Sequence, residues 1–333
     1  MARRAIILLC SISLLLDHSW GSLQVGFYSS TCPAAESIVR SAVRAAMTFD
    51  WTITAPLLRL HFHDCFVQAY FQWLGCEGSI LIDGPTSEKT SRAHAGLRGF
   101  DVIDAAKSQL EQVCPGVVSC SDIVALAARD SVSMSGGPSY QVETGRRDGL
   151  ASVASDASRM PDVNDPISVL KAKFAAKGLS ASDLVLLSAG GHSIGTAACF
   201  FMTKRLYAFT PAGGSDRSIN PAFLPALELT CPANGDVNVR LPLDQGSEFS
   251  FDKNILNNIR FGFAVLASDA QLYEDPSTRR VVDSYFGLRG GSVPDLSSSS
   301  FHRDFANAMV KMGRVGVKTG SQGEIRRVCS RFN

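Results

Sequence analysis

Apolar residues recur at intervals of three and four along much of the chain, which is the spacing of an amphipathic helix. This pattern predicts helices over residues 36–47, 122–134 and 301–312. Pro33 precedes the first helix where a first-turn proline is tolerated, and Ser119 precedes the second as a candidate cap. In the third, Phe305, Met309 and Met312 share one face, which we expect to pack in the core.

Strand-like alternation of apolar and polar residues is scarce, so the chain offers little material for a sheet. The segments rich in glycine, proline and aspartate connect helices rather than hairpins, and they comprise residues 83–85, 161–166, 211–215 and 230–235. We therefore expect an all-α fold.

One stretch, Ala5 to Leu16, is continuously apolar, but its twelve residues fall short of the roughly 20 that a membrane-spanning helix needs. It follows Arg3 and Arg4 and precedes small residues that end at Ser22, which is the layout of a secretory signal peptide. The sequence predicts a signal peptide over residues 1–22 and one domain over residues 23–333.

Charge and composition narrow the range of partners. The chain carries 32 Lys and Arg against 31 Asp and Glu, a net charge of +1, and 45% of its residues are hydrophobic. That is enough apolar material for a large core. A net charge this close to zero provides too little positive charge to attract nucleic acid or an anionic membrane, so we expect neither partner.

Nine cysteines occur, and Cys10 lies in the predicted signal peptide, which leaves eight in the mature chain. An even number of cysteines behind a signal peptide indicates a disulfide framework, although spacing alone leaves 105 pairings open. No Cys-x-x-Cys motif occurs, so neither a zinc ribbon nor a thioredoxin-like redox site is supported.

Two segments compete for the chemistry, and the first runs from Arg59 to Cys65. On a helix Arg59 and His63 lie four residues apart and share a face, so a fixed cation and an imidazole base point into one cavity. That pair suits acid–base work beside developing negative charge. The alternatives are a purely structural histidine and a metal held by His61 and His63.

The second segment, residues 188–195, contains the sequence Gly-His-Ser-Ile-Gly, which matches the nucleophile elbow of a serine hydrolase. In that interpretation Ser193 is the nucleophile of an esterase, with Asp269 and His302 following in the order of a triad. The elbow, however, needs a parallel sheet, which the chain does not predict. A weaker match to penicillin-recognising enzymes combines Ser168 and Lys171 with residues 318–320.

The segment from Leu58 to Gln68, the Gly190–Gly195 segment and the eight cysteines together resemble the secreted plant haem peroxidases called class III. The resemblance covers essentially the whole mature chain. It implies a helical haem peroxidase fold in which distal and proximal halves sandwich the haem. It also implies four disulfides, which pair Cys32 with Cys114, Cys65 with Cys76, Cys120 with Cys329, and Cys199 with Cys231.

The resemblance also assigns roles around a haem b. His192 resembles the axial iron ligand, and Asp269 the carboxylate that accepts its other ring N–H. His63 would move the proton of hydrogen peroxide, Arg59 would stabilise the charge as the O–O bond breaks, and Phe62 would narrow access. Pro161 corresponds to the residue that lines the edge where donors bind.

The reaction implied is reduction of hydrogen peroxide coupled to two one-electron oxidations of phenolic donors, with cell-wall phenolics and peroxide removal as the setting. We expect a monomer. The chain stops shortly after Cys329 with no further tail, so we expect secretion to the apoplast or cell wall.

Two structural calcium ions are implied by the same resemblance, each held by oxygen ligands. The distal ion would use Asp64, the Val67 carbonyl, the Gly75 carbonyl, Glu77 and Ser79. The proximal ion would use Ser193, Asp244, Ser247, the Ser250 carbonyl and Asp252.

Three features depart from the family pattern. Residues 69–74 form an insertion within the distal calcium loop, and we expect it to weaken that site, which leaves a catalytically weakened peroxidase as an alternative. His94 occupies the place of an asparagine that hydrogen-bonds the distal histidine, and we expect it to accept the same N–H. Finally, the approach to His192 over residues 188–192 is one residue longer than usual.

Overall fold

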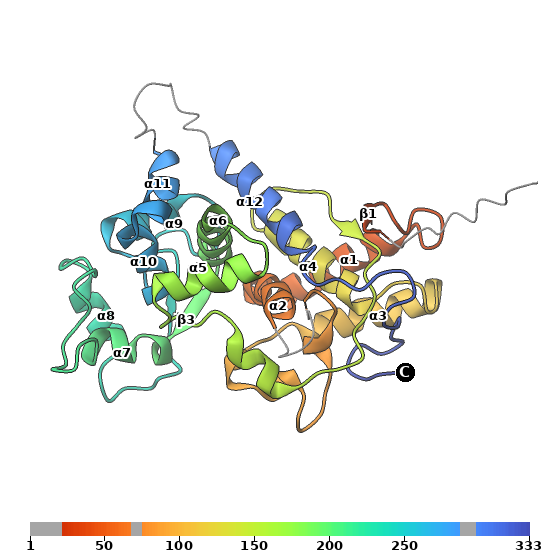
Figure 1. The fold of residues 1–333 in the computed structure, drawn as a ribbon, viewed down its shortest axis with the longest axis horizontal. Helices are drawn as coiled ribbons and strands as arrows, with labels where there is room; N and C mark the ends of the chain where they lie inside the picture. The colour runs from red at the N-terminus through yellow and green to blue at the C-terminus, as the bar shows by residue number, and fades with distance from the viewer. Residues whose placement is uncertain (1–21, 68–74, 287–297) are drawn as a thin grey trace, which may run out of the picture.

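The computed structural model describes residues 22–67, 75–286 and 298–333 (Figure 1). Except for Ser22, the signal peptide expected over residues 1–22 lies outside the described residues, and so does the insertion at 69–74. The all-α prediction is confirmed, because the strands are limited to two short antiparallel pairs within the described part of the chain.

The N-terminal half of the fold is a bundle of four helices that meet in one apolar cluster. They are α1 (Ala35–Phe49), α2 (Thr54–Phe66), α3 (Phe100–Val113) and α4 (Cys120–Met134). Helix α2 packs most extensively on α4. It contributes Leu57 and Leu60 to this cluster and Leu58 and Phe66 to the next one, so it forms the wall between the two halves.

The helices predicted over 36–47 and 122–134 are observed with bounds up to two residues wider, as α1 and α4. The residue expected at the helix start is confirmed in one of the two. The Ser119 side chain caps α4 by accepting a hydrogen bond from the Asp122 N–H over 3.1 Å, as expected. Pro33, in contrast, lies outside the first turn of α1, which begins at Ala35. A hydrogen bond of 2.9 Å from the Ala35 N–H to the Cys32 carbonyl holds Pro33 in a tight turn ahead of the helix.

The second half, drawn in green to light blue in Figure 1, contains seven helices. They are α5 (Ile167–Ala176), α6 (Ala181–His192), α7 (Thr203–Tyr207), α8 (Leu224–Thr230), α9 (Asn254–Phe261), α10 (Ala267–Glu274) and α11 (Pro276–Ser284). A capping box between Ser180 and Asp183 starts α6. The last residue of α6 is His192, so this helix delivers one of the two key histidines.

Helix α12 (Ser298–Met312) packs along α6, and the chain then returns to the N-terminal half (Figure 1). Phe305, Met309 and Met312 are buried, which confirms the predicted core face. After α12, the buried Arg326 guanidinium donates hydrogen bonds to the carbonyls of Gly78 and Gly149. The C-terminal segment therefore fastens the first half of the fold.

Short strands and turns complete the fold. Strand β1 (Gln24–Val25) pairs with β2 (Glu143–Thr144), and β3 (Thr196–Ala198) pairs with β4 (Arg240–Pro242). Short 3-10 turns include η1 (Trp51–Ile53), η2 (Ser79–Leu81), η3 (Glu88–Thr90), η4 (Arg92–His94), η5 (Ala154–Arg159) and η6 (Cys199–Phe201). Within the described ranges, no helix has the length and apolarity that crossing a membrane would require.

The four disulfides are those implied by the resemblance: Cys32–Cys114, Cys65–Cys76, Cys120–Cys329 and Cys199–Cys231. The first ties the turn ahead of α1 to the end of α3, and the third ties α4 to the C-terminal segment across 209 residues of sequence. Cross-links that close loops of this length restrict the unfolded chain strongly.

Candidate active site

Helix α2 brings Arg59 and His63 together on one face. The Arg59 Nε–H donates a hydrogen bond of 3.0 Å to His63 Nε2, as the four-residue spacing predicted. The Phe62 ring lies against the Phe66 ring, with centroids 4.3 Å apart, and borders the same histidine.

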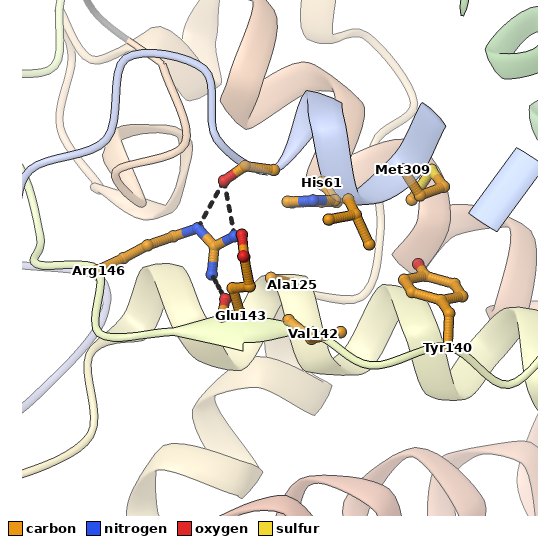
Figure 2. A pocket seen from close by; sticks show the side chains of 9 residues that line it. His61, Ala125, Tyr140, Val142, Glu143, Arg146 and Met309 are labelled. Atoms are coloured by element: carbon orange, nitrogen blue, oxygen red, sulfur yellow. Dashed lines mark hydrogen bonds between the residues drawn. The ribbon is translucent and has the colours of Figure 1, made fainter. Parts of the chain in front are cut away.

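His61 points away from this pair. In Figure 2 its ring faces a small pocket that is also lined by Tyr140, Arg146 and Met309. Its Nδ1 lies 3.7 Å from the sulfur of Cys65, which is already bonded to Cys76. The interpretation of His61 and His63 as two ligands of one metal is therefore wrong, because residues two apart on a helix project to different faces.

The second imidazole at the distal site is His94, whose Nδ1 lies 3.1 Å from His63 Nδ1. Because the Arg59 Nε–H donates to His63 Nε2, that nitrogen is the acceptor, and His63 carries its proton on Nδ1. The Nδ1–H then donates to His94, as expected. His94 keeps its own proton on Nε2, which is buried and has no hydrogen-bond partner among the described residues.

The electrostatics of the distal site favour neutral imidazoles beside a fixed cation. Burial, reinforced by the Arg59 and His94 charges, lowers the pKa of His63 well below its usual value. Burial and Arg59 lower the pKa of His94 to about 4. Burial and the charge of Arg240 lower the pKa of Arg59 to about 10, so its guanidinium stays charged near neutral pH.

On the proximal side, His192 ends α6 and Asp269 projects from α10. Each carboxylate oxygen of Asp269 lies 2.9 Å from His192 Nδ1, and the Asp269 side chain is buried. Burial opposes charging of the ring, but the Asp269 carboxylate outweighs it and raises the pKa of His192. Helix α6 runs unbroken through residues 188–192, so the extra residue does not prevent this contact.

Helices α2 and α6, which carry the two histidines, are in contact. The charge of Arg59 acts on the pKa of His192 as well as on that of His63. The His192 side chain keeps 30% of its exposure, and its Nε2 has no hydrogen bond within the described part of the chain. An imidazole fixed at Nδ1 by a carboxylate, with Nε2 left open, is suited to bind a metal, so the residues present fit a haem iron.

The esterase interpretation of Ser193 is wrong. Residues 191–195 lie at the end of a helix and lead into a strand, the reverse of the strand-to-helix order of a nucleophile elbow. Ser193 is buried, and its hydroxyl donates to the Asp252 carbonyl over 2.9 Å. Asp269 contacts His192, while His302 packs edge-on against the Phe251 ring, so no triad is formed.

The residues assigned to the proximal calcium ion lie close together. Ser193 contacts the carbonyls of Ser250 and Asp252, and the Ser247 hydroxyl lies 3.2 Å from Asp244 Oδ2 and 3.3 Å from Asp252 Oδ1. Burial and the neighbouring Asp252 raise the pKa of Asp244 to about 7. Ser193 and Asp244 are buried, Ser247 and Asp252 are half-buried, and Ser250 is exposed. Such a concentration of oxygens fits a hard cation.

The residues assigned to the distal ion also leave oxygens without partners. Asp64 accepts from the Gly78 N–H through Oδ2, whereas its Oδ1 has no partner among the described residues, and the same holds for Glu77 Oε1. Burial raises the pKa of Asp64 to about 7. The Ser79 hydroxyl donates to Glu88 Oε2 over 3.0 Å. Buried carboxylates with free oxygens fit a cation here too.

Three residues beside the distal oxygens were not predicted. Burial raises the pKa of Glu88 to about 9, and its Oε1 has no partner in the described ranges. The Lys318 ammonium lies 2.6 Å from Glu77 Oε2, and the Lys177 ammonium donates to the Val67 carbonyl over 2.8 Å. Glu88 lies six residues before His94 in the sequence, and this proximity was the one signal that could have indicated it. The two lysines come from distant parts of the chain, so no local signal indicated them.

Pro161 follows η5, and its neighbour Met160 is buried in the same apolar cluster as Phe66. Within the described residues, no hydrogen bond or ring contact links Pro161 to either histidine. Its assignment to the donor edge therefore stays a prediction, as does that of the Gly75 carbonyl to the distal ion.

Comparisons with known proteins agree with this arrangement. A family model described as Peroxidase matches residues 39–287. Peroxidase 43 of Arabidopsis thaliana is 58% identical to the chain, with 97% of this chain and 96% of that protein covered. Peroxidase 13 of the same plant is 53% identical, with 96% and 95% covered. Peroxidase N1 of Nicotiana tabacum is 49% identical, with 100% and 97% covered.

Proposed function

This chain belongs to the plant class III peroxidase family and is a haem peroxidase, and we propose that it works with haem b, hydrogen peroxide and phenolic donors through the residues described above. The observation that carries this assignment of roles is the presence of two differently arranged imidazoles on the contacting helices α2 and α6. His63 presents an unprotonated Nε2 beside Arg59, and His192 is fixed by Asp269 with its own Nε2 open.

We propose that His192 Nε2 holds the iron. When bound, haem supplies the redox chemistry, namely reduction of the peroxide and the later one-electron oxidation of donors. The Asp269 carboxylate accepts the Nδ1–H of His192, which orients the ring and increases its electron donation.

His63 and Arg59 would act on the peroxide itself. The His63 Nε2 takes a proton from hydrogen peroxide and returns it to the oxygen that departs as water. The low pKa of His63 keeps this nitrogen unprotonated, and hydrogen peroxide would replace the Arg59 Nε–H as its hydrogen-bond donor. The bond to His94 fixes which nitrogen faces the substrate. The Arg59 guanidinium stabilises the negative charge that develops as the O–O bond breaks.

The remaining assignments concern donors and ions. The Phe62 ring beside His63 would restrict access, so phenolic donors give up electrons at the edge near Pro161. The buried oxygens around Asp64 and Asp244 would each hold one calcium ion, in the sites named for the distal and proximal ion. These ions would fix the segments on either side of the two histidines.

We also propose that the protein is secreted as a monomer after removal of residues 1–22. The apolar stretch behind Arg3 and Arg4 supports a signal peptide. The four disulfides support an oxidising compartment.

The assignment of His192 is tested by refolding the chain with haemin and calcium and recording its visible spectrum and its oxidation of a simple phenol. The unmodified chain should take up haem and oxidise the phenol with repeated turnover. The His192→Gly variant should bind haem weakly, and added imidazole should restore the spectrum by filling the vacated place. Haem uptake by His192→Gly equal to that of the unmodified chain would refute the ligand assignment.

A further inference from the structure

We infer that the Arg240 guanidinium is a carboxylate anchor at the edge of the haem site, where it binds a propionate of the haem. The inference rests on the proposed function, since it takes the haem to lie between His63 and His192. It adds a haem-binding residue that neither the sequence motifs nor the roles proposed for His63 and His192 indicate.

Arg240 is held in place by the small sheet beside the proximal histidine. The backbone of Arg240 pairs with that of Ala198 where β3 and β4 meet, and β3 begins shortly after His192. The Arg240 Nε–H donates to Thr196 Oγ1 over 2.7 Å, and Nη2 donates to the Thr196 carbonyl over 2.6 Å. Two hydrogen bonds to one residue fix the plane of the guanidinium while Nη1 makes no hydrogen bond within the described residues.

The same strand start lies against the distal helix. Gly195 has a φ of +96°, and a Cβ added there would lie 2.5 Å from the Ala55 Cβ, so the backbones of β3 and α2 approach closely. Arg59 is one helical turn beyond Ala55 and shares its face. Arg240 therefore stands where the distal and proximal walls of the site converge, and its charge reaches Arg59, whose pKa it helps to lower.

Two guanidinium groups at this edge, those of Arg59 and Arg240, have no carboxylate partner among the described residues. Arg98 is paired with Asp50 over 3.0 Å, but no carboxylate forms an ion pair with Arg240 or Arg59 among the described residues. Burial and the charge of Arg98 lower the pKa of Arg240, as expected for a guanidinium with no carboxylate paired to it among the described residues. Like charges that act on one another are unfavourable unless an anion joins them.

Haem b brings the missing charge, because it carries two propionate groups. A guanidinium binds a carboxylate through two parallel hydrogen bonds, and Arg240 keeps donors available for this contact. Arg240 is exposed, as suits a partner for the polar edge of an otherwise apolar ring. A phenolic acid is the other possible source of a carboxylate. The propionate is favoured because Arg240 is anchored to the strand that follows His192.

The test measures haem loss from the refolded holoprotein to an excess of a haem-scavenging protein, by the change in the Soret band. Arg240→Gln should lose haem about five- to tenfold faster than the unmodified chain, in line with the worth of a charge-assisted hydrogen bond at an exposed site. Arg44→Gln is the matched control, since Arg44 is exposed on α1, and it should lose haem at the unmodified rate.

Haem whose propionates are methyl esters separates a direct contact from an indirect one. With this haem, Arg240→Gln and the unmodified chain should lose the group equally fast. The inference would be overturned if Arg240→Gln and the unmodified chain lost ordinary haem at equal rates. It would also be overturned if the variant still lost the methyl-ester haem faster. So would a rise in the KM for a phenolic acid relative to a neutral phenol without faster haem loss, since that assigns Arg240 to the donor. Failure of the unmodified chain to bind haem at His192 would instead defeat the proposed function.

Discussion

At the scale of single residues, the distal site is set by which nitrogen of each imidazole carries a proton. The chain of contacts from Arg59 through His63 to His94 leaves only one consistent assignment, with His63 Nε2 as the acceptor. This assignment leaves the Nε2–H of His94 buried without a partner among the described residues, which is energetically unfavourable. A histidine at this position therefore makes the distal base sensitive to a second protonation.

Activity in acid should report that protonation. His94 has a pKa of about 4, and once protonated on Nδ1 it can no longer accept the Nδ1–H of His63. We expect kcat/KM for hydrogen peroxide to fall as the pH drops through about 4. His94→Asn should keep a larger fraction of its neutral-pH activity below that point, because an amide oxygen accepts without titrating. Coincident pH profiles would count against this role.

The same residue affects stability, with a sign that follows from linkage. The pKa of His94 is about 4 in the folded chain and about 6.5 in the unfolded chain, so between these values the unfolded chain binds more protons. Stability is unaffected above pH 6.5 and falls as the pH drops toward 4. The difference in urea midpoint between pH 7 and pH 5 should be smaller in His94→Asn, and an equal or larger difference would contradict this account.

At the scale of elements, the long helices could be predicted because a buried stripe repeats with the helical period. Periodicity could not predict which side chains face one another, or in which order helix and strand follow. It left His61 and His63 as possible joint ligands, although the turn of α2 separates them, and it left Ser193 as a possible nucleophile until the helix-to-strand order was seen. Lys318 reaches Glu77 from beyond α12, a contact that no local pattern contains.

The contact between α6 and α12 offers a test at this scale. A Cβ at Gly190 would lie 2.1 Å from Cδ2 of the fully buried Phe305 ring. We expect Gly190→Ala to lower the free energy of unfolding by about 1–3 kcal/mol through overpacking. Urea denaturation measures the effect.

The neighbouring glycine is the matched control. Apart from its chain neighbours and the backbone of α6 itself, no described atom lies within 4 Å of a Cβ placed on Gly191, which is also within α6. Gly191→Ala should leave stability unchanged or raise it by up to about 1 kcal/mol, since alanine favours the helix. Equal losses in both variants would show that the packing against Phe305 is not the cause.

At the scale of the whole molecule, disulfides brace each half separately, and Cys120–Cys329 ties α4 to the C-terminal segment. Polar clusters lie around Asp64 and Asp244. The disulfide pairing was implied by the family resemblance, since spacing alone left every pairing open. The acidic residues of both clusters were implied in the same way. Glu88 was not, because its partner Ser79 and the neighbouring carboxylates meet it only in the folded chain.

Removal of calcium should loosen both clusters. Without a cation, the buried carboxylates around Asp64 and Asp244 have no full compensation, so a chelator should lower the Tm by several degrees and added calcium should restore it. Calorimetry should count two ions in the unmodified chain and one in either Asp64→Asn or Asp244→Asn. An unchanged Tm in chelator, with no ion bound, would remove calcium from the account.

The central claim is that His63 and Arg59 act on hydrogen peroxide across from His192. The most direct measurement is the visible spectrum of the refolded, haem-loaded chain in the first seconds after one equivalent of hydrogen peroxide. The account predicts a rapid change of the Soret band in the unmodified chain, slowed about 10²- to 10⁴-fold in His63→Ala, the usual worth of a positioned acid–base group. A Soret band that changes equally fast in both proteins, or barely changes in the unmodified chain, would contradict it.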